Sequence, residues 1–240
     1  MVGEVLLLPG DKMMIVGQTQ SGKSTLATAM ARAFDVGSLA MYDPKNDPGA
    51  MVPNCARVYS AADAIRHLPG RVCWTPRRAN SSGVMDGWDA ICERLLRLAE
   101  RGHSSMVVVH ETADLGTPQT IGPAFRTLLQ QGANLGGGRA SITAILASQR
   151  PLGIPKIVRT EVGHVACFTL TDPDDRDLMA RLMGDIEHPE WAESIRRTPL
   201  PLNRRWFYRG PRYRLELHEP IAMPGPHKET GSNAQGSPRA

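Results

Sequence analysis

An eight-residue stretch near the start of the sequence has the residue types and the spacing that bind phosphate groups. Residues 17–24, GQTQSGKS, fit the pattern G-x-x-x-x-G-K-[ST], whose glycines let the backbone turn back and point successive N–H groups at a phosphate. The Lys23 ammonium can reach the outer phosphates of a nucleoside triphosphate, and the Ser24 hydroxyl can bind Mg²⁺. We therefore predict a site for ATP and Mg²⁺. The expected nucleotide contacts are Gly17, Gln18, Thr19, Gln20, Ser21, Gly22, Lys23, Ser24 and Thr25.

The residues on either side have the patterns of the elements that such a loop requires. Residues 13–16 are all apolar, which predicts a buried strand, and residues 24–33 have the composition of a helix. A strand, a glycine loop and a helix in this order bind phosphate because the loop N–H groups add to the positive end of the helix dipole.

A candidate base follows the most hydrophobic run of the chain, residues 106–109, which predicts a central strand. Hydrolysis needs a metal-positioning group and a group that orients the attacking water. Glu111 is the candidate for the water. His110 takes the place before it, where a carboxylate would add negative charge for Mg²⁺. A solvated strand-end carboxylate at Glu111, or a site that binds nucleotide and hydrolyses it poorly, stays an alternative.

Further metal candidates follow from the same reasoning. Asp43 comes directly after the apolar run 39–42, and the carboxyl ends of parallel strands line the ligand crevice of an α/β sheet. Ser24, His110 and Asp43 are therefore the predicted metal residues, and Asp43 or Asp114 could compensate for the neutral imidazole. A simple turn before Pro44 is the alternative for Asp43.

Two more candidates flank the apolar run 142–147. Gln149 follows it, where a side-chain amide can hydrogen-bond a γ-phosphate or the attacking water and so sense the nucleotide. Arg139 precedes it, directly after three glycines. A guanidinium on such a loop could reach a neighbouring subunit's site and stabilise charge on the transferring phosphoryl group. An ordinary surface arginine is the alternative.

The bulk composition sets the class of protein. The 240 residues carry a net charge of +4, and the four cysteines show no C-x-x-C spacing, so we expect neither structural zinc nor a disulfide framework, and a reduced, cytosolic setting. We expect no signal peptide and no membrane span. Strands alternating with helices predict an α/β fold with a largely parallel sheet. Predicted strands are 5–8, 12–16, 39–42, 57–59, 71–75, 106–109, 142–147 and 164–170; predicted helices are 23–34, 61–67, 86–101, 118–131, 174–183 and 189–197.

The C-terminal part of the chain changes in composition. Residues 204–218 predict a hairpin, and residues 221–240 are rich in proline, glycine and serine, which predicts a disordered tail. We therefore expect a single motor domain over residues 1–220, followed by that tail.

The spaced set GQTQSGKST, YDPK, VVVHE, GGGR and ILASQRP resembles the FtsK/HerA superfamily of DNA-pumping ATPases, over roughly residues 5–185. The continuation through residues 149–176 looks like the small viral members that package genomes. The resemblance implies a P-loop NTPase fold of the RecA/ASCE-like kind. It also implies that Lys23 and Ser24 bind phosphates and Mg²⁺, that Glu111 is catalytic and that Gln149 is the sensor. For the finger supplied to a neighbour it implies Arg139, ahead of Arg126 and Arg150. The sequence departs from the family at His110, where the family has Asp.

The resemblance implies an ATPase that drives translocation of double-stranded DNA. The expected setting is a ring of about five or six copies that packages a viral genome into a preformed capsid in the host cytoplasm, on a portal or another platform, without a membrane. Arg77 and Arg78 are the candidate DNA contacts, with a solvated loop as the alternative. A basic-aromatic stretch in the hairpin is expected to pack rather than to bind DNA; its arginines are Arg204, Arg205, Arg212 and Arg214.

Other functions stay open. A conjugative or segregation pump of the same superfamily is one, and a nucleotide-gated module that binds DNA or protein with weak hydrolysis is another, favoured by His110. A metabolic kinase would leave residues 149–151 without a role.

Overall fold

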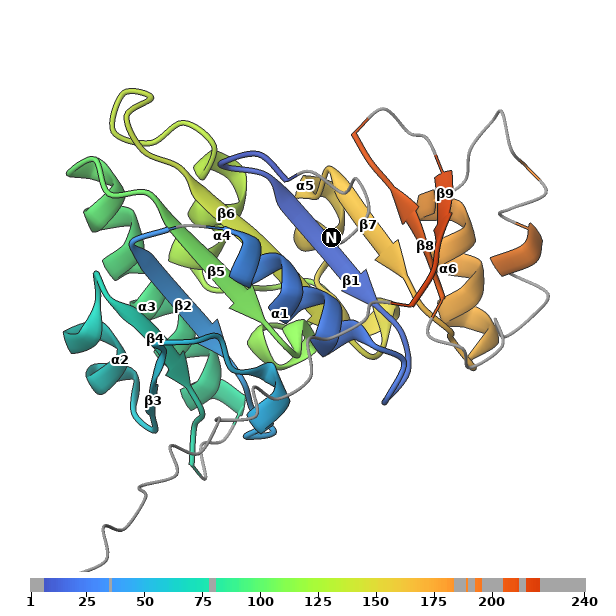
Figure 1. Ribbon diagram of the computed structural model, residues 1–240, viewed down its shortest axis with the longest axis horizontal. Helices are drawn as coiled ribbons and strands as arrows, with labels where there is room; N and C mark the ends of the chain where they lie inside the picture. Colours follow the sequence, from blue (N-terminus) through green and yellow to red (C-terminus); the bar gives the residue numbers. More distant parts are fainter. Residues whose placement is uncertain are drawn as a thin grey trace, which may run out of the picture.

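A mostly parallel sheet organises the chain in the computed structural model, which describes residues 7–34, 36–77, 81–183, 189, 193–195, 205–211 and 215–220 (Figure 1). Within these residues nine strands lie side by side in the order β3-β4-β2-β5-β6-β1-β7-β8-β9. The strands are β1 (Lys12–Val16), β2 (Ser38–Tyr42), β3 (Ala56–Val58), β4 (Arg71–Trp74), β5 (Ser105–Val109), β6 (Ile142–Ser148), β7 (His164–Cys167), β8 (Trp206–Arg209) and β9 (Leu215–His218). All pairs from β3 to β7 are parallel, and β8 and β9 continue the sheet antiparallel.

Helices cover both faces of the sheet, and the alternation of side chains along the strands explains why. Met13 and Ile15 of β1 share a core with α1 (Lys23–Ala33), whereas Met14 and Val16 share a second core with the helices of the other face. Figure 1 shows α1 in front of the sheet and α3 and α4 behind it. The second core contains residues of α2 (Ala61–His67), α3 (Ser81–Glu100), α4 (Pro123–Gln131), α5 (Lys156–Glu161) and α6 (Pro173–Met183). Because both faces are covered, the central strands are continuous apolar runs.

Most predicted elements are confirmed within one or two residues, and β5 lies inside the sheet between β2 and β6 as expected. The hairpin is confirmed as β8 and β9, which pair antiparallel. The predicted strand at 5–8 is not confirmed, because Leu7 and Leu8 lie outside any strand and residues 1–6 lie outside the described part. Residues 189 and 193–195 are helical, and the rest of the predicted helix 189–197 lies outside it, as do residues 221–240. None of the described helices is long and apolar enough to cross a membrane.

Three predicted boundaries are wrong. The helix predicted at 86–101 begins at Ser81, because burial of Val84 in the core outweighs the low helix propensity of Gly83. The helix predicted at 118–131 begins at Pro123, since Thr117 and Thr120 close a turn in front of it. The strand β7 ends at Cys167 instead of residue 170, because the following backbone runs along the phosphate loop.

Candidate nucleotide site

Residues 17–22 form a tight loop between β1 and α1, and two neighbouring segments hold it. Gly17 and Gly22 have φ values of 155° and 113°, the region that favours glycine. The Gly17 N–H donates to the Ser148 carbonyl at 3.3 Å, and the Gln18 N–H donates to the Thr169 carbonyl at 2.8 Å. A Cβ on Gly17 would lie 2.6 Å from the Phe168 Cβ. The loop therefore has the conformation that the motif predicts, and only glycine fits at its start.

The first residue of α1 places a cation beside this loop. Lys23 is 7% exposed, and its Nζ donates to the Gln18 carbonyl at 2.8 Å. Burial lowers the pKa of Lys23 to about 8, an effect that Glu111 opposes and Lys45 reinforces. Gly22 precedes the helix without a side-chain cap, so the N–H groups of the first turn are available to an anion.

A crevice of about 270 Å³ opens at this end of the sheet. Its lining residues are Thr19, Gln20, Gly22, Lys23, Ser24, Thr25, Asp43, Pro44, Lys45, Asp47 and His110. The structure thus brings the phosphate loop together with the predicted metal residues, and adds Lys45 and Asp47, which the sequence reasoning missed. Both lie within three residues after Pro44, so the same strand-end argument could have found them.

The Asp43 carboxylate supports the crevice wall. It is 1% exposed and accepts the backbone N–H groups of Lys45 and Asp47 at 3.2 and 2.8 Å. Arg57 of β3 lies 3.4 Å from its Oδ2 and also contacts Asn46 and the Asp47 carbonyl. With its oxygens bound in this way, Asp43 holds the loop 43–47 in place. Its role as a metal ligand stays a prediction.

His110 contributes an uncharged side chain to the crevice wall. It is buried, and within the described part of the chain neither ring nitrogen has a hydrogen-bond partner of normal geometry. Burial lowers its pKa, against the opposing effect of Asp43 and Asp47, so the imidazole is neutral near pH 7.

The side chains of the crevice fit Mg²⁺ only if few of its ligands come from the protein. The described residues hold no group of three or more His, Cys, Asp or Glu that could bind a metal. Magnesium often keeps several waters and binds one or two protein groups plus the substrate phosphates. The Ser24 hydroxyl, in the crevice wall, suits that arrangement.

Glu111, Gln149 and the phosphate loop form one hydrogen-bonded group. The Gln149 Nε2 donates to Glu111 Oε2 at 3.1 Å, and the Thr19 hydroxyl donates to Gln149 Oε1 at 2.7 Å. The Ser148 hydroxyl donates to Glu111 Oε1. Two residues predicted from separate motifs are therefore neighbours. Ser148 was missed, because a serine at the end of a buried strand carries no sequence signal of its own.

The arginine candidates lie in different places. Arg139 precedes β6 at the end of the sheet opposite the phosphate loop. It is exposed, and its Nε donates to the Gly136 carbonyl at 3.0 Å. It cannot reach the phosphates of its own chain. Arg150 lies beside its own phosphate loop and pairs with Asp172 and Asp175 at 3.0 and 3.2 Å. Arg126 is exposed on the second turn of α4.

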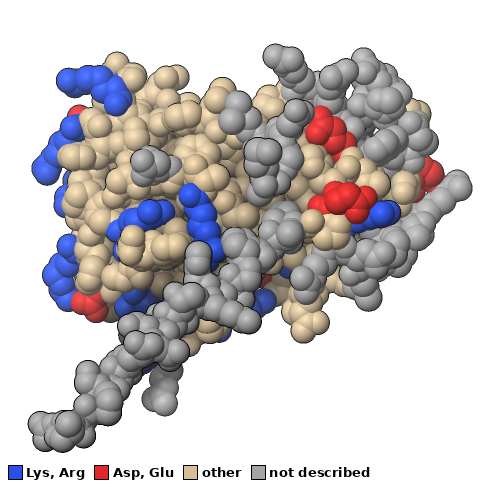
Figure 2. Space-filling view, in the orientation of Figure 1, with Lys and Arg blue, Asp and Glu red and all other residues tan. Residues whose placement is uncertain are grey.

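The predicted DNA contacts are only partly described. The Arg77 guanidinium lies 3.6 Å from the centre of the Tyr59 ring, which is 40% exposed. Arg78 lies outside the described residues, as do three of the hairpin arginines, Arg204, Arg212 and Arg214. Arg205 pairs with Glu219 at 3.0 Å. Figure 2 shows Lys and Arg side chains gathered on the side that carries β2, β3 and β4.

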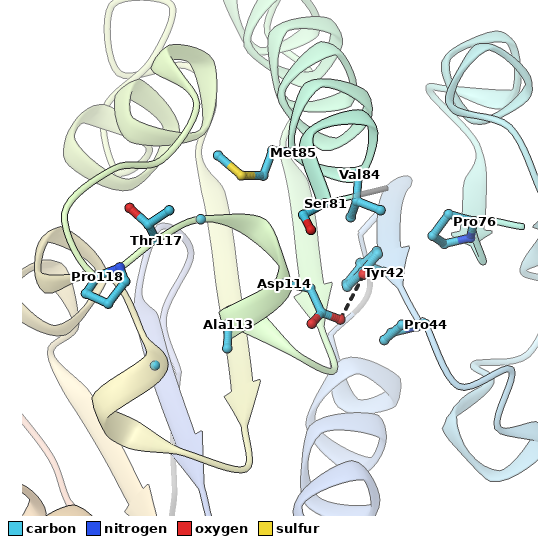
Figure 3. Close-up of a pocket in the computed structure, with 12 residues that line it drawn as sticks. Tyr42, Pro44, Pro76, Ser81, Val84, Met85, Ala113, Asp114, Thr117 and Pro118 are labelled. Atoms are coloured by element: carbon cyan, nitrogen blue, oxygen red, sulfur yellow. Dashed lines mark hydrogen bonds between the residues drawn. The ribbon is translucent and has the colours of Figure 1, made fainter. Parts of the chain in front are cut away.

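A wider hollow of about 670 Å³ adjoins the crevice at the same end of the sheet and shares Pro44 with it. Figure 3 shows Asp114 pointing toward Tyr42, whose hydroxyl donates to the carboxylate at 3.0 Å. Asp114 lines this hollow and not the phosphate crevice. The lining of the crevice thus gives no support to a compensation of His110 by Asp114, which stays a prediction.

The fold is shared with solved structures of NTPases. The genome packaging NTPase B204 from Sulfolobus turreted icosahedral virus 2, in complex with sulfate, matches with a TM-score of 0.68 and 17% identity over 90% of this chain and 99% of that one. Its complex with AMPPCP matches with a TM-score of 0.66 and 18% identity, over 90% and 100% of the two chains. The cytoplasmic domain of the Thermomonospora curvata Type VII secretion ATPase EccC matches with a TM-score of 0.55 and 16% identity, over 92% of this chain and 26% of that one.

The sequence matches no protein-family model and no curated protein. At 16 to 18% identity, the likeness to these solved structures is one of fold. The chain has the P-loop NTPase fold of viral genome-packaging NTPases.

Proposed function

We propose that this chain is the ATP-hydrolysing subunit of a ring motor that moves double-stranded DNA, and that it packages a viral genome into a preformed capsid. One observation carries the proposal: the phosphate loop, Glu111 and Gln149 form a single hydrogen-bonded group at one end of the sheet. The fold shared with a genome packaging NTPase supports it.

The residues divide the work of hydrolysis. Lys23 and the N–H groups at the start of α1 hold the β- and γ-phosphates. The Ser24 hydroxyl would hold Mg²⁺, which would neutralise phosphate charge. Glu111 orients the attacking water and accepts its proton, and Gln149 lies between this carboxylate and the phosphate loop, where it responds to the γ-phosphate.

The opposite position of Arg139 supports a ring. Because it lies at the far end of β6 from its own crevice, its guanidinium can act only on the site of another copy. Heterologous contacts of this kind close into a ring when the rotation between copies closes. We propose that Arg139 completes each site in this way.

Double-stranded DNA is the proposed cargo. A motor that moves any sequence binds backbone phosphates. The exposed Arg77, which lies three residues after β4, and Arg78, which follows it in the sequence, are the proposed contacts. Basic side chains gather on the side that carries β4 (Figure 2). The capsid portal or another platform in the host cytoplasm is the proposed docking partner.

One observation favours a second function. His110 supplies no negative charge for Mg²⁺, so the chain could bind ATP and turn it over slowly, as a nucleotide-gated module that binds DNA or protein.

Steady-state phosphate release with and without double-stranded DNA separates the two functions. We expect DNA to stimulate release by the wild-type protein, and Lys23→Ala and Glu111→Gln to abolish it. Arg97→Ala, an exposed change on α3, is the matched control and should keep full activity. Tight ATP binding without release, with or without DNA, would instead support the module, and full release by Glu111→Gln would exclude the proposed mechanism.

A further inference from the structure

Ser148 links the phosphate loop to the candidate base. It is the last residue of β6 and is completely buried. Its carbonyl accepts the Gly17 N–H at 3.3 Å, and its hydroxyl donates to Glu111 Oε1. The same residue therefore holds the first glycine of the loop and one oxygen of the carboxylate.

The Glu111 carboxylate accepts two more hydrogen bonds from Gln149, the residue after Ser148. The Gln149 backbone N–H lies 3.4 Å from Oε1, and the side-chain Nε2 lies 3.1 Å from Oε2. The carboxylate sets the orientation of this amide: because an ionised carboxylate only accepts hydrogen bonds, the NH₂ group must face Glu111. The amide oxygen, Oε1, then faces the phosphate loop, where the Thr19 hydroxyl donates to it at 2.7 Å.

These hydrogen bonds leave one acceptor direction of the Glu111 carboxylate unoccupied. An ionised carboxylate has about four acceptor directions, two on each oxygen. Ser148 and the Gln149 N–H fill those of Oε1, and the Gln149 side chain fills one of Oε2. No other described residue makes a hydrogen bond to the Glu111 carboxylate in this structure. The remaining direction of Oε2 is where a water can donate a proton.

We infer that Ser148 is a positioning residue for Glu111: its hydroxyl fixes Oε1, so that Oε2 presents its open direction to the attacking water. Thr19, acting through Gln149, is the second support and connects the base to the loop that holds the phosphates. The inference rests on the proposed ATPase function. It adds a residue that touches neither the nucleotide nor the water.

The test compares three substitutions at Ser148 with one control. Ser148→Ala removes the donor, Ser148→Cys keeps the size with only a weak donor, and Ser148→Thr keeps the hydroxyl. Ser105→Ala is the control, because Ser105 is a buried serine at the far end of the adjacent strand and its hydroxyl has no hydrogen-bond partner among the described residues. Phosphate release over a pH series and binding of a fluorescent ATP analogue are measured for each variant.

We expect Ser148→Ala and Ser148→Cys to lower kcat by about 10- to 100-fold, the worth of a hydrogen bond to a charged group. The Kd for the analogue should change by less than about threefold, a small free-energy difference. The acid limb of the kcat profile should move to higher pH, because a donor to the charged carboxylate is lost. Ser148→Thr should restore most of kcat, and Ser105→Ala should match the wild type.

Each other outcome has a distinct meaning. If kcat and its pH profile are unchanged in Ser148→Ala and Ser148→Cys, Ser148 does not position the base. If kcat and Kd change together, or Ser148→Thr is as slow as Ser148→Ala, the role is structural and the inference is wrong. If the wild-type protein binds the analogue but releases no phosphate under any condition, the proposed ATPase function fails instead.

Discussion

Arg57 Nη1 lies 3.4 Å from the Asp43 carboxylate, and this ion pair joins the edge strand β3 to the wall of the phosphate crevice. Asp43 is almost fully buried, and it holds the loop that carries Lys45 through two backbone hydrogen bonds. A residue far from any sequence motif thus supports the nucleotide site.

Arg57→Met should weaken both the fold and the site. Removing the guanidinium leaves a buried carboxylate short of a charged partner, which we expect to cost about 1.5–3 kcal/mol of unfolding free energy. ATP affinity should fall because the loop with Lys45 loses its anchor. Arg66→Met is the control, since Arg66 pairs with Asp63 on the surface, where such pairs contribute little. Equal urea midpoints for the two variants would contradict this account.

Nucleotide binding should take up protons at alkaline pH. Burial lowers the pKa of Lys23 to about 8, so the ammonium is charged at pH 7 and half neutral at pH 8. A bound triphosphate favours the charged form and pulls the proton back. We expect an uptake of about half a proton per ATP at pH 8, and close to none at pH 7.

Calorimetry in two buffers of different ionisation enthalpy measures this uptake. Lys23→Arg is the matched control, because a guanidinium stays protonated in this range. If Lys23→Arg still binds ATP, it should show no uptake. An absence of uptake at pH 8 in the wild type would mean that Lys23 is fully charged before ATP binds.

His110→Asp should increase the apparent affinity for Mg²⁺ during ATP hydrolysis. The new carboxylate would lie in the crevice wall with Asp43 and Asp47, so repulsion should lower the melting temperature without ligand. With ATP, the added charge should lower the Mg²⁺ concentration for half-maximal phosphate release by about tenfold, equivalent to about 1.4 kcal/mol. His110→Asn, which has the shape without the charge, should show neither effect. If both variants behave alike, the identity of this residue does not limit metal binding.

The sequence predicted the structure best where the local residue pattern agrees with the packing of the element in the fold. The run 13–16, the glycines of the loop and the composition of α1 each specify their own structure, so this strand, loop and helix were predicted correctly. The apolar run 106–109 placed Glu111 at the right strand end for the same reason.

Contacts between segments that are distant in the sequence could not be predicted from local patterns. Nothing near Arg57 predicts that β3 lies close enough to reach Asp43, because strand order depends on the whole sheet. Asp114 likewise has a partner that is distant in the sequence, Tyr42 of β2, and both residues line the wider hollow. The proposed role of Ser148 depends on the pairing of β6 with both β1 and β5.

Arg139→Ala should bind ATP normally and hydrolyse it slowly, because the missing guanidinium serves a neighbouring site. We expect a loss of about 10³-fold in kcat. Mixing Arg139→Ala with Lys23→Ala should recover part of the activity, since a ring of both contains intact sites at some boundaries. Two variants that stay inactive when mixed, in assemblies shown to contain both, would argue that Arg139 acts elsewhere.

Displacement of a third strand from a DNA triplex tests the central claim most directly. A motor that moves along the duplex strips off the bound oligonucleotide, and this can be followed by fluorescence on the assembled protein. We predict displacement by the wild type with ATP and Mg²⁺, and none by Glu111→Gln or with a non-hydrolysable analogue. Phosphate release that is stimulated by DNA yet leaves the triplex intact would contradict translocation.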